Sequence, residues 1–347
     1  MPSLHPRYLS GLTFGASELS AIHRLGEFRG RQDLFVRQFP EQLGTLRTHA
    51  IIESAESSNR IEGVVAAPGR VAELVVRRTE PRTRSEQEIA GYRDALQLIH
   101  ESHADMRFAV NVVLQLHHLL YRYQPGAGGR WKSTDNQIVE RDADCTVVRV
   151  RFTPTPAVAT PQATADLVAH YQAAVEESMA DPLTVLPLAV LDFLCIHPFT
   201  DGNGRVGRLL SLLLLYHFDY QVGRYVSLER IIEESRDTYY EALASSSRGW
   251  HEHAHDPHPW LGYFWGVLIR AYAEFEERVE TLKGSKGDQV RAAVFRRIGA
   301  FGIADLEQDC PGVSRDMVRH VLREMRAEGR VQVEGRGPGA KWRVVTA

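Results

Sequence analysis

The segment from His197 to Arg208, H-P-F-T-D-G-N-G-R-V-G-R, contains side chains that can bind a phosphate ester and react with it. Gly202 and Gly204 allow positive φ and leave room for a ligand. Backbone N–H groups at the start of the helix expected after them lack partners, so they form an anion site. Arg205 and Arg208 stand at i,i+3 spacing on one helix face, and two guanidinium groups suit a polyphosphate.

Two further side chains of this segment supply metal and acid–base chemistry. Asp201 offers a carboxylate that can bind Mg²⁺, a cation that takes few protein ligands beside phosphates. His197 can accept a proton near neutral pH. The pattern predicts that a hydroxyl group gives its proton to His197 and attacks a phosphorus atom. The Mg²⁺ on Asp201, the glycine amides and the arginines would hold the developing charge.

Two other nucleotide-binding patterns do not fit the chain. Gly202, Gly204 and Gly207 match the dinucleotide fingerprint G-x-G-x-x-G, which needs a strand that leads directly into the first glycine. Here residues 197–201 intervene, and no adjoining segments alternate between strand and helix. The sequence contains no G-x-x-x-x-G-K-[ST] loop, which excludes a P-loop NTPase.

The same segment resembles the signature of the Fic family, H-P-F-x-[DE]-G-N-[GK]-R-x-x-R, at every fixed or restricted position. Segments 152–156, 232–243 and 256–260 are also similar to the family, so the likeness covers roughly residues 45–280. The resemblance implies that AMP is transferred from ATP, with Mg²⁺, to Ser, Thr or Tyr hydroxyls. The acceptor would be a target protein or the chain itself, and His197 would be the general base.

The resemblance also implies places for the other site residues. Phe199 would anchor the loop in the core, Asp201 would bind Mg²⁺, and Ile138 and Val139 would lie in a β-hairpin flap that docks the target. Tyr239 would border the adenine, although the family often has Asn where this chain has Ser247. The residues implied at the ATP site are Glu62, Gly202, Asn203, Gly204, Arg205, Arg208 and Tyr239.

A second motif lies upstream. Residues 58–63, S-N-R-I-E-G, match the family's inhibitory pattern [ST]-x-x-x-E-[GN]. Ser58 and Glu62 at i,i+4 spacing face the same way on a helix, and Gly63 is a typical residue to end it. The Glu62 carboxylate can pair bidentately with Arg208 at the γ-phosphate position. We expect self-inhibition; an exposed glutamate before a capping glycine is the alternative.

The apolar periodicity predicts a mainly α protein: a Fic-type helical bundle with a β-hairpin flap, followed by a C-terminal winged helix-turn-helix. We expect a helical N-terminal region at 1–100, the catalytic core at 101–284 and the winged helix at 285–347, with a linker at 283–288. Helices are expected at 41–61, 85–100, 108–121, 163–179, 185–196, 205–218, 228–246, 260–282, 289–298, 303–309 and 314–328. Strands are expected at 138–139, 146–152, 330–334 and 341–345.

The helix expected at 314–328 carries Arg315, Arg319 and Arg323 at i,i+4 spacing, and further basic residues follow it. Such a helix can enter the major groove of DNA while the wing touches phosphate. Winged helices also dock proteins, and acidic residues are interspersed here, so both partners stay open. The histidine-dense stretch 251–258 lacks helical zinc-ligand spacing, which favours a solvated loop over a metal site.

Composition excludes some classes of protein. The chain has 347 residues and a formal net charge of −3, so no whole-chain basic field draws it to nucleic acid or a membrane. No apolar run approaches the roughly 20 residues needed to span a bilayer. Cys145, Cys195 and Cys310 are far apart, which is typical of a reducing compartment. We therefore expect a cytoplasmic protein without a membrane partner.

Several functions remain open at this stage. Glu62 could position a water for removal of AMP instead of blocking a phosphate. A winged-helix transcription regulator whose Fic region senses nucleotide is a second alternative; kinase-like or phosphocholine transfer fits the intact G-N-G-R-x-x-R less well. The target protein, the modified residue type and the oligomeric state, including a homodimer, are not fixed by the sequence.

Overall fold

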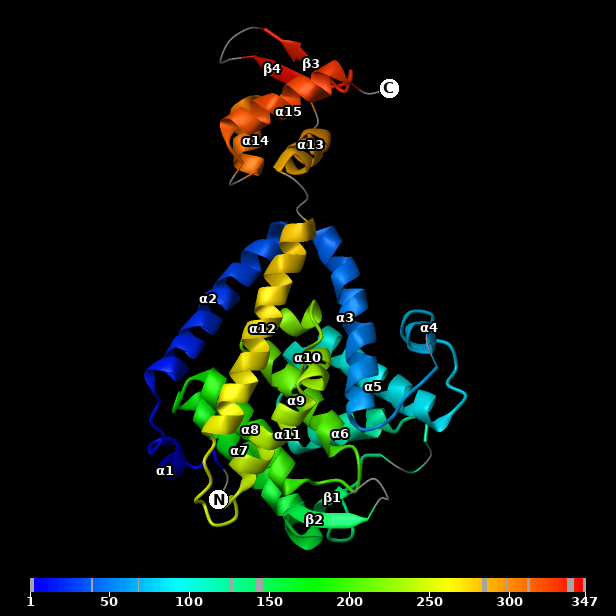
Figure 1. The fold of residues 1–347 in the computed structure, drawn as a ribbon, viewed down its shortest axis with the longest axis vertical. Helices are drawn as coiled ribbons and strands as arrows, with labels where there is room; N and C mark the ends of the chain where they lie inside the picture. Colours follow the sequence, from blue (N-terminus) through cyan, green and yellow to red (C-terminus); the bar gives the residue numbers. More distant parts are fainter. Residues whose placement is uncertain are drawn as a thin grey trace. The chain divides into compact units, whose positions relative to one another are not determined.

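The computed structural model describes residues 3–38, 40–67, 69–124, 126, 128–141, 146–282, 286–297, 299–310, 313–335 and 340–345. The chain divides into two compact units, Met1–Phe275 and Glu276–Ala347, which are described separately (Figure 1). The three-part division expected at residues 100 and 284 remains a prediction. Cys145, Pro311 and the expected hairpin tip at 336–339 lie outside the described residues.

Helices make up most of the first unit, and the only strands among its described residues form one antiparallel pair. Three short 3₁₀ turns lie at His103–Asp105, Ala157–Ala159 and Val222–Arg224. The strands are β1 (Ile138–Arg141) and β2 (Val147–Phe152). The helices are α1 (Pro6–Leu9), α2 (Ala16–Gln38), α3 (Pro40–Ile61), α4 (Arg70–Val76), α5 (Arg84–Ser102), α6 (Val110–Leu120), α7 (Thr160–Glu176), α8 (Pro182–Ile196), α9 (Asn203–His217), α10 (Leu228–Glu234), α11 (Arg236–Ser247) and α12 (His258–Leu282), which continues past Phe275.

Helix α8 forms the centre of the first unit. It packs against α7 and α9, and every residue from Leu183 to Ile196 is buried, as expected for a helix that is apolar all round. Pro187 lies inside it and cannot donate a hydrogen bond to the carbonyl of Leu183. The indole Nε1 of Trp265 donates to that carbonyl instead, at 2.7 Å. Helix α12 thereby satisfies the group that the proline leaves open.

The segment 228–246 is two helices and not the single helix expected from its periodicity. Helix α10 ends at Ser235, whose backbone (φ −114°, ψ 32°) leaves the helical region before α11 begins. The Ser235 hydroxyl donates to the carbonyl of Ile231 at 2.8 Å and lies 2.9 Å from the Tyr263 hydroxyl. A serine that bonds its own backbone competes with the helix, which accounts for the break.

The flap is the hairpin of β1 and β2, which pairs Ile138 with Phe152 and Val139 with Val150. Helix α11 contacts β2, and Figure 1 shows the hairpin at one end of the first unit. The first hundred residues are mainly helical, as expected, but α1, α2 and α4 had not been located individually. Among the described residues, none of the helices has the length and apolar character required to cross a bilayer.

The second unit contains α13 (Lys286–Arg296), α14 (Ile303–Asp309) and α15 (Arg315–Ala327), followed by the antiparallel strands β3 (Val331–Glu334) and β4 (Lys341–Val344). This is the element order of a winged helix. The Ser314 hydroxyl caps α15 by accepting from the Met317 N–H at 3.3 Å, as predicted. Helix α13 already begins at Lys286, so the end of the expected linker at 286–288 is helical, while 283–285 lie outside the described residues.

A separate apolar core holds the second unit together. Phe301 and Trp342 exchange backbone hydrogen bonds at 2.9 and 2.8 Å, which ties the segment before α14 to β4. The side chains in this core come from all three helices and both strands: Val290, Val294, Phe301, Leu306, Val318, Val321, Leu322, Met325, Val331 and Trp342, with Val333 and Val344 packed against it. The predicted fold class, a mainly helical protein with small two-stranded sheets, is confirmed.

Candidate active site

The loop between α8 and α9 begins and ends in left-handed backbone. His197 ends α8 with φ 51° and ψ 61°, and Gly202 precedes α9 with φ 82°. A Cβ at Gly202 would lie 2.9 Å from Leu120 Cδ2, so both conformation and space require glycine. Helix α9 begins at Asn203, two residues before the predicted start. Gly204 is therefore helical, and the prediction that it uses positive φ is wrong.

Phe199 and Asn203 hold the loop closed from within. The Asn203 carboxamide accepts from the Phe199 N–H at 2.9 Å and donates to the Phe199 carbonyl at 2.8 Å. Both residues are buried. The Asn203 side chain thus stabilises the shape of the loop. Its backbone amide is the group left for the contact with a nucleotide that the resemblance implies.

His117 of α6 supports the same loop from below. Its ring stacks on Phe199, with centroids 3.7 Å apart and planes 1° from parallel. Its Nδ1 accepts from the Gly129 N–H at 2.9 Å, so the proton must be on Nε2, which donates to the Asp201 carbonyl at 3.1 Å. Burial lowers the pKa of His117 to about 4, which keeps this neutral tautomer. Sequence reasoning missed this residue. Its only signal in the sequence was a histidine within a mostly apolar helix.

The His197 imidazole has the form that a general base requires. Its Nδ1 lies 3.2 Å from the Leu194 carbonyl, and since a carbonyl only accepts, Nδ1 carries the proton. Burial lowers the pKa of His197 to about 4, and the nearby Lys132 ammonium contributes in the same direction. The ring is therefore neutral at pH 7, with the lone pair of Nε2 available.

Ser58 and Glu62 both contact Arg208, as their i,i+4 spacing predicted. Arg208 Nε donates to Ser58 Oγ at 2.8 Å, and Nη2 donates to the Ser58 carbonyl at 2.9 Å and to Glu62 Oε1 at 2.8 Å. The carboxylate uses one oxygen, so the expected bidentate pairing is wrong: Ser58 occupies the second half of the guanidinium fork. A Cβ on Gly204 would overlap Glu62 Oε1, which explains the glycine there.

The end of α3 fixes the direction of Glu62. Gly63 has φ 79°, and its N–H donates to the Arg60 carbonyl at 3.0 Å, while the Val64 N–H donates to the Asn59 carbonyl at 2.9 Å. This pair of bonds is a Schellman motif, with Gly63 at the C′ position that the sequence predicted. Glu62 is the last residue before the turn.

Arg205 does not join Arg208 at one anion, contrary to the sequence prediction. It is 1% exposed and forms an ion pair with Glu88 of α5 at 2.5 Å. Its other Nη donates to the Tyr121 hydroxyl at 3.0 Å, and Asn59 Oδ1 lies 3.3 Å from Nη1. A buried charge needs such partners, and here they hold the start of α9 against α3, α5 and α6. Sequence reasoning missed Glu88 and Tyr121 because only helix packing brings them to Arg205.

Asp201 lies at the mouth of the loop with its side chain 66% exposed. Its Oδ1 accepts from the Gly202 N–H at 2.7 Å, and Oδ2 is 3.6 Å from Arg205 Nη2. Burial raises the pKa of Asp201, but Arg205, the Tyr121 hydroxyl and the Gly202 amide outweigh it, so the net pKa is below its ordinary value. The carboxylate is ionised and accessible, as a magnesium ligand must be.

A cleft of about 1020 Å³ opens beside the loop. The flap forms one wall and α11 another, so the structure brings together residues that are far apart in the sequence. Its lining includes several predicted site residues: Glu62, Ile138, Val139, His197, Gly204, Tyr239 and Ser247. Asp201, Gly202, Asn203, Arg205 and Arg208 do not line the cleft.

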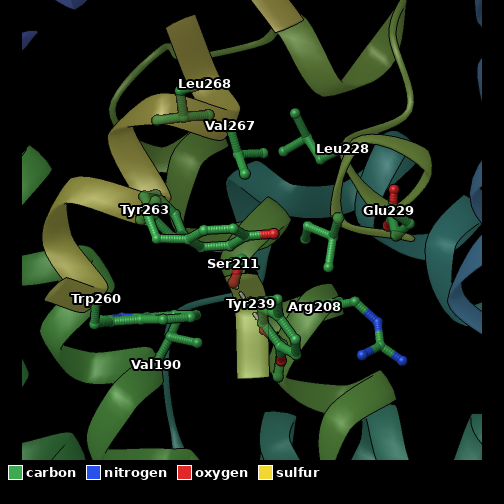
Figure 2. A pocket seen from close by; sticks show the side chains of 13 residues that line it. Val190, Arg208, Ser211, Leu228, Glu229, Tyr239, Trp260, Tyr263, Val267 and Leu268 are labelled. Carbon is green, nitrogen blue, oxygen red and sulfur yellow. Dashed lines mark hydrogen bonds between the residues drawn. The ribbon is translucent and has the colours of Figure 1, made fainter. Parts of the chain in front are cut away.

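A much smaller cavity of about 30 Å³ lies behind Tyr239. Figure 2 shows its aromatic side, formed by Tyr239, Trp260 and Tyr263, together with Arg208. Tyr239 lies 5.8 Å from Trp260 and 5.7 Å from Tyr263, measured between ring centroids. This volume has room for a water molecule or two and not for a purine. Tyr239 also forms part of the wall of the larger cleft.

The histidines of 251–258 diverge instead of gathering. His251 contacts the flap, His255 is 5% exposed and lies 2.8 Å from Ser3 Oγ, and His258 lies 2.6 Å from Glu18. The expected solvated loop is thus wrong for His255, which is part of the core. Within the described ranges, no three His, Cys, Asp or Glu side chains are placed to hold a metal ion together.

Comparisons with known proteins agree on this region. The model of the Fic/DOC family matches residues 107–215, which contain the loop, helices α6 to α8 and most of α9. A Fido domain-containing protein of Dictyostelium discoideum is 37% identical over 79 residues, or 22% of this chain and 55% of that protein. The match thus spans about half the length of that relative.

Solved structures with the same fold cover more of the chain. A Fic family protein from Desulfovibrio desulfuricans G20 has a TM-score of 0.64 at 24% identity, over 97% of this chain and 98% of that one. A Fic domain containing signaling protein from Bacteroides thetaiotaomicron has 0.63 at 19%, over 74% and 97%. Fic-1 from C. elegans has 0.60 at 20%, over 78% and 74%. Residues 107–215, around the H-P-F-T-D-G-N-G loop, thus match the Fic/DOC family, and the chain shares its fold with these Fic proteins.

Proposed function

We propose that this protein transfers AMP from ATP to hydroxyl groups of proteins and that Glu62 inhibits the transfer. Fic domain proteins are known to transfer nucleoside monophosphates to proteins and typically use ATP and a divalent metal. The observation that carries the proposal is that the neutral imidazole of His197, the Glu62 carboxylate and Gly204 in the first turn of α9 line one cleft.

His197 acts as the base. The hydroxyl oxygen of the target attacks the α-phosphorus and its proton passes to Nε2 of His197, while the bond from the α-phosphorus to the β-phosphate oxygen breaks and pyrophosphate leaves. Because Nδ1–H is held by the Leu194 carbonyl, Nε2 is kept in the acceptor form. The amides at the start of α9 face the negative charge that develops on the phosphate oxygens.

Mg²⁺ fits the donor set at Asp201, which is ionised and accessible. A single carboxylate beside phosphate oxygens is a common arrangement for this ion, which supplies charge neutralisation when it is bound. Asp201 would hold it, with the Gly202 amide fixing the orientation of the carboxylate through Oδ1.

Arg208 is the group that inhibition would use. Its Nη1 is buried and has no hydrogen-bond partner, while Nη2 is paired with Glu62. An outer phosphate of ATP would offer oxygens to both nitrogens and form a bidentate contact. The Glu62 carboxylate holds the same guanidinium, so ATP cannot settle in the productive position without displacing it.

The test is transfer of label from α-³²P-ATP with Mg²⁺, followed on the protein itself and on lysate proteins, with intact mass to identify one added adenylyl group. Glu62→Gly should increase labelling at least tenfold, in line with a coupling of about 1.4 kcal/mol or more. Glu62→Gln, which keeps the size and loses the charge, should fall between. His197→Ala in the Glu62→Gly background should abolish labelling; persistent activity there would remove the base assignment.

Removal of AMP is the second candidate, because Glu62 lines the same cleft as His197 and could orient a water molecule. An assay with an AMP-modified protein as the substrate distinguishes the two functions. Release of AMP that requires Glu62 would favour removal, whereas release by neither the wild type nor Glu62→Gln would leave transfer as the activity of the site.

A further inference from the structure

The surface of α15 in the second unit carries a segregation of charge that the catalytic cleft does not explain. Four arginines, Arg315, Arg319, Arg323 and Arg326, fall within about 80° of the helix circumference at 3.6 residues per turn. All four are exposed, and the side chains of Arg315 and Arg319 are 48% and 50% exposed. We refer to these four residues as the arginine flank.

The acidic residues at the end of α15 lie on the opposite side and share one cationic partner. Glu324 and Glu328 form ion pairs with Arg291 of α13, at 3.0 and 2.8 Å. This pairing is internal to the unit and leaves the arginine flank outside it. The sequence left the partner open because acidic residues lie among the arginines. Of these, Glu324 and Glu328 pair with Arg291, and Asp316 lies beside the arginine flank.

The contacts on the arginine flank itself are weak. Arg315 is 3.6 Å from Glu307 and Arg319 is 3.5 Å from Asp316, whose side chain is 91% exposed. Exposed pairs at such distances contribute little and are screened by salt. Arg323 Nε donates to the carbonyl of Arg319, so no carboxylate neutralises its charge there. A stronger polyanion can replace these partners at small cost.

The rest of the unit favours a rigid presentation of this flank. Val318, Val321, Leu322 and Met325 are buried on the other side of α15, so the orientation of the helix is set by the core. The strand β4 adds Lys341 and Arg343, which alternate with the buried Trp342 and are exposed. Evenly spaced cations on a helix, with more on an adjoining hairpin, match the phosphates and the major groove of duplex DNA.

We propose that the arginine flank of the second unit binds duplex DNA, mainly through its phosphates. This function is independent of AMP transfer, because none of the residues involved lines the cleft. The predicted affinity is dominated by counterion release, so it falls steeply as salt increases.

The experiment measures fluorescence anisotropy of a labelled random-sequence DNA duplex with the full-length chain, from about 50 to 200 mM salt. The wild type should bind at low salt with a steep salt dependence. Arg315→Ala/Arg319→Ala/Arg323→Ala should weaken binding at least tenfold and reduce the salt slope by roughly three. The corresponding triple lysine variant keeps the charge and should retain most of the binding.

The matched control removes three exposed arginines of the first unit, Arg24, Arg77 and Arg107, and should change the affinity less than twofold. Thermal melting of each variant checks that the fold persists. The proposal fails if the wild type does not shift the anisotropy at about 50 mM salt, or if the control triple weakens binding as much as the arginine-flank triple. In either case the arginine flank is not a DNA-binding surface.

Discussion

At the scale of single residues, the site depends on which nitrogen of each histidine carries a proton. His197 and His117 are both neutral, and each has its tautomer fixed by one backbone group: the Leu194 carbonyl for His197 and the Gly129 N–H for His117. The first leaves a base free in the cleft. The second supports the loop from below. Both effects follow from burial, which disfavours the imidazolium form.

The depressed pKa of His197 predicts an unusual pH profile. The folded-state pKa of about 4 lies below the ordinary 6.5, so the base form is retained as the pH falls through 6.5 and is lost only near 4. Self-modification by the Glu62→Gly variant should therefore stay constant between about pH 8 and 5, within twofold. A tenfold fall with a midpoint near 6.5 would show that His197 titrates as an exposed histidine and would contradict this environment.

The sequence predicted the residues of the loop and their general chemistry, but not how the charges are distributed around it. Arg205 and Arg208 look equivalent in G-N-G-R-V-G-R. The structure separates them, because Glu88 of α5 meets Arg205 while Ser58 and Glu62 of α3 meet Arg208. These partners lie more than a hundred residues away along the chain, so only the packing of the helices decides which partners each arginine has.

At the scale of elements, the end of α3 and the flap set the two sides of the cleft. The Schellman motif at Gly63 fixes where Glu62 lies, and the hairpin of β1 and β2 forms the wall across from α11. Neither element contains a catalytic group. Both position the groups that act.

Gly63→Ala should partly release the inhibition. Alanine at φ 79° costs about 1–2 kcal/mol, which favours a relaxed helix end and moves Glu62 from Arg208. Self-modification should rise above wild type and remain below Glu62→Gly. The control is Gly69→Ala, which has a similar φ of 76° and open space around it and should leave the rate unchanged. If both alanine variants change the rate equally, the cap has no specific role.

His251 connects the flap to the loop after α11 and is predicted to position it. Its ring stacks on Phe152, with centroids 5.5 Å apart, and its Nε2 donates to the Thr153 carbonyl at 2.8 Å. In the Glu62→Gly background, His251→Ala should reduce labelling of lysate proteins severalfold without changing the dissociation constant for ATP. His251→Phe, which keeps the stacking, should restore part of the labelling. Equal loss of ATP binding would indicate a general disturbance of the cleft.

At the scale of the whole first unit, a buried carboxyl group of the central helix connects the N-terminal segment to the loop before α12. Asp192 of α8 accepts from Ser3 Oγ and Trp250 Nε1, each at 2.6 Å, and its Oδ2 has no partner. His255 lies 2.8 Å from the same serine hydroxyl. The N-terminal segment, the central helix and the loop before α12 thus share one polar cluster.

Burial raises the pKa of Asp192 to about 7, against 3.8 for an ordinary aspartate. A raised carboxyl pKa means that the folded state binds the proton more tightly, so stability declines as the pH rises from about 4 to 7. Asp192→Asn removes the titration. The difference in unfolding free energy between the variant and the wild type should favour the variant more at pH 8 than at pH 5. The change should be on the order of a few kcal/mol at most, and melting curves of both proteins at the two pH values would measure it. A difference between variant and wild type that does not change with pH would show that Asp192 remains ionised.

The overall architecture was predictable where local signals are strong and failed where they are absent. The loop between α8 and α9 was found because Pro198 cannot continue a helix and Gly202 adopts left-handed backbone, whereas the start of α8 was placed too late because Pro187 lies inside the helix. The division between α10 and α11 was missed because Ser235 breaks the helix with its own hydroxyl and no proline or glycine marks it. Helix α2 was missed since only a few of its side chains, including Leu25 and Phe28, are buried.

Under the proposed function, the Glu62 carboxylate competes with the phosphates of ATP for Arg208. ATP must outcompete it, so the apparent affinity is lowered by the fraction of time that the arginine is occupied. A modest rise in nucleotide concentration, or a partner that moves α3 away from Arg208, would then raise the rate of transfer without a change in any catalytic group.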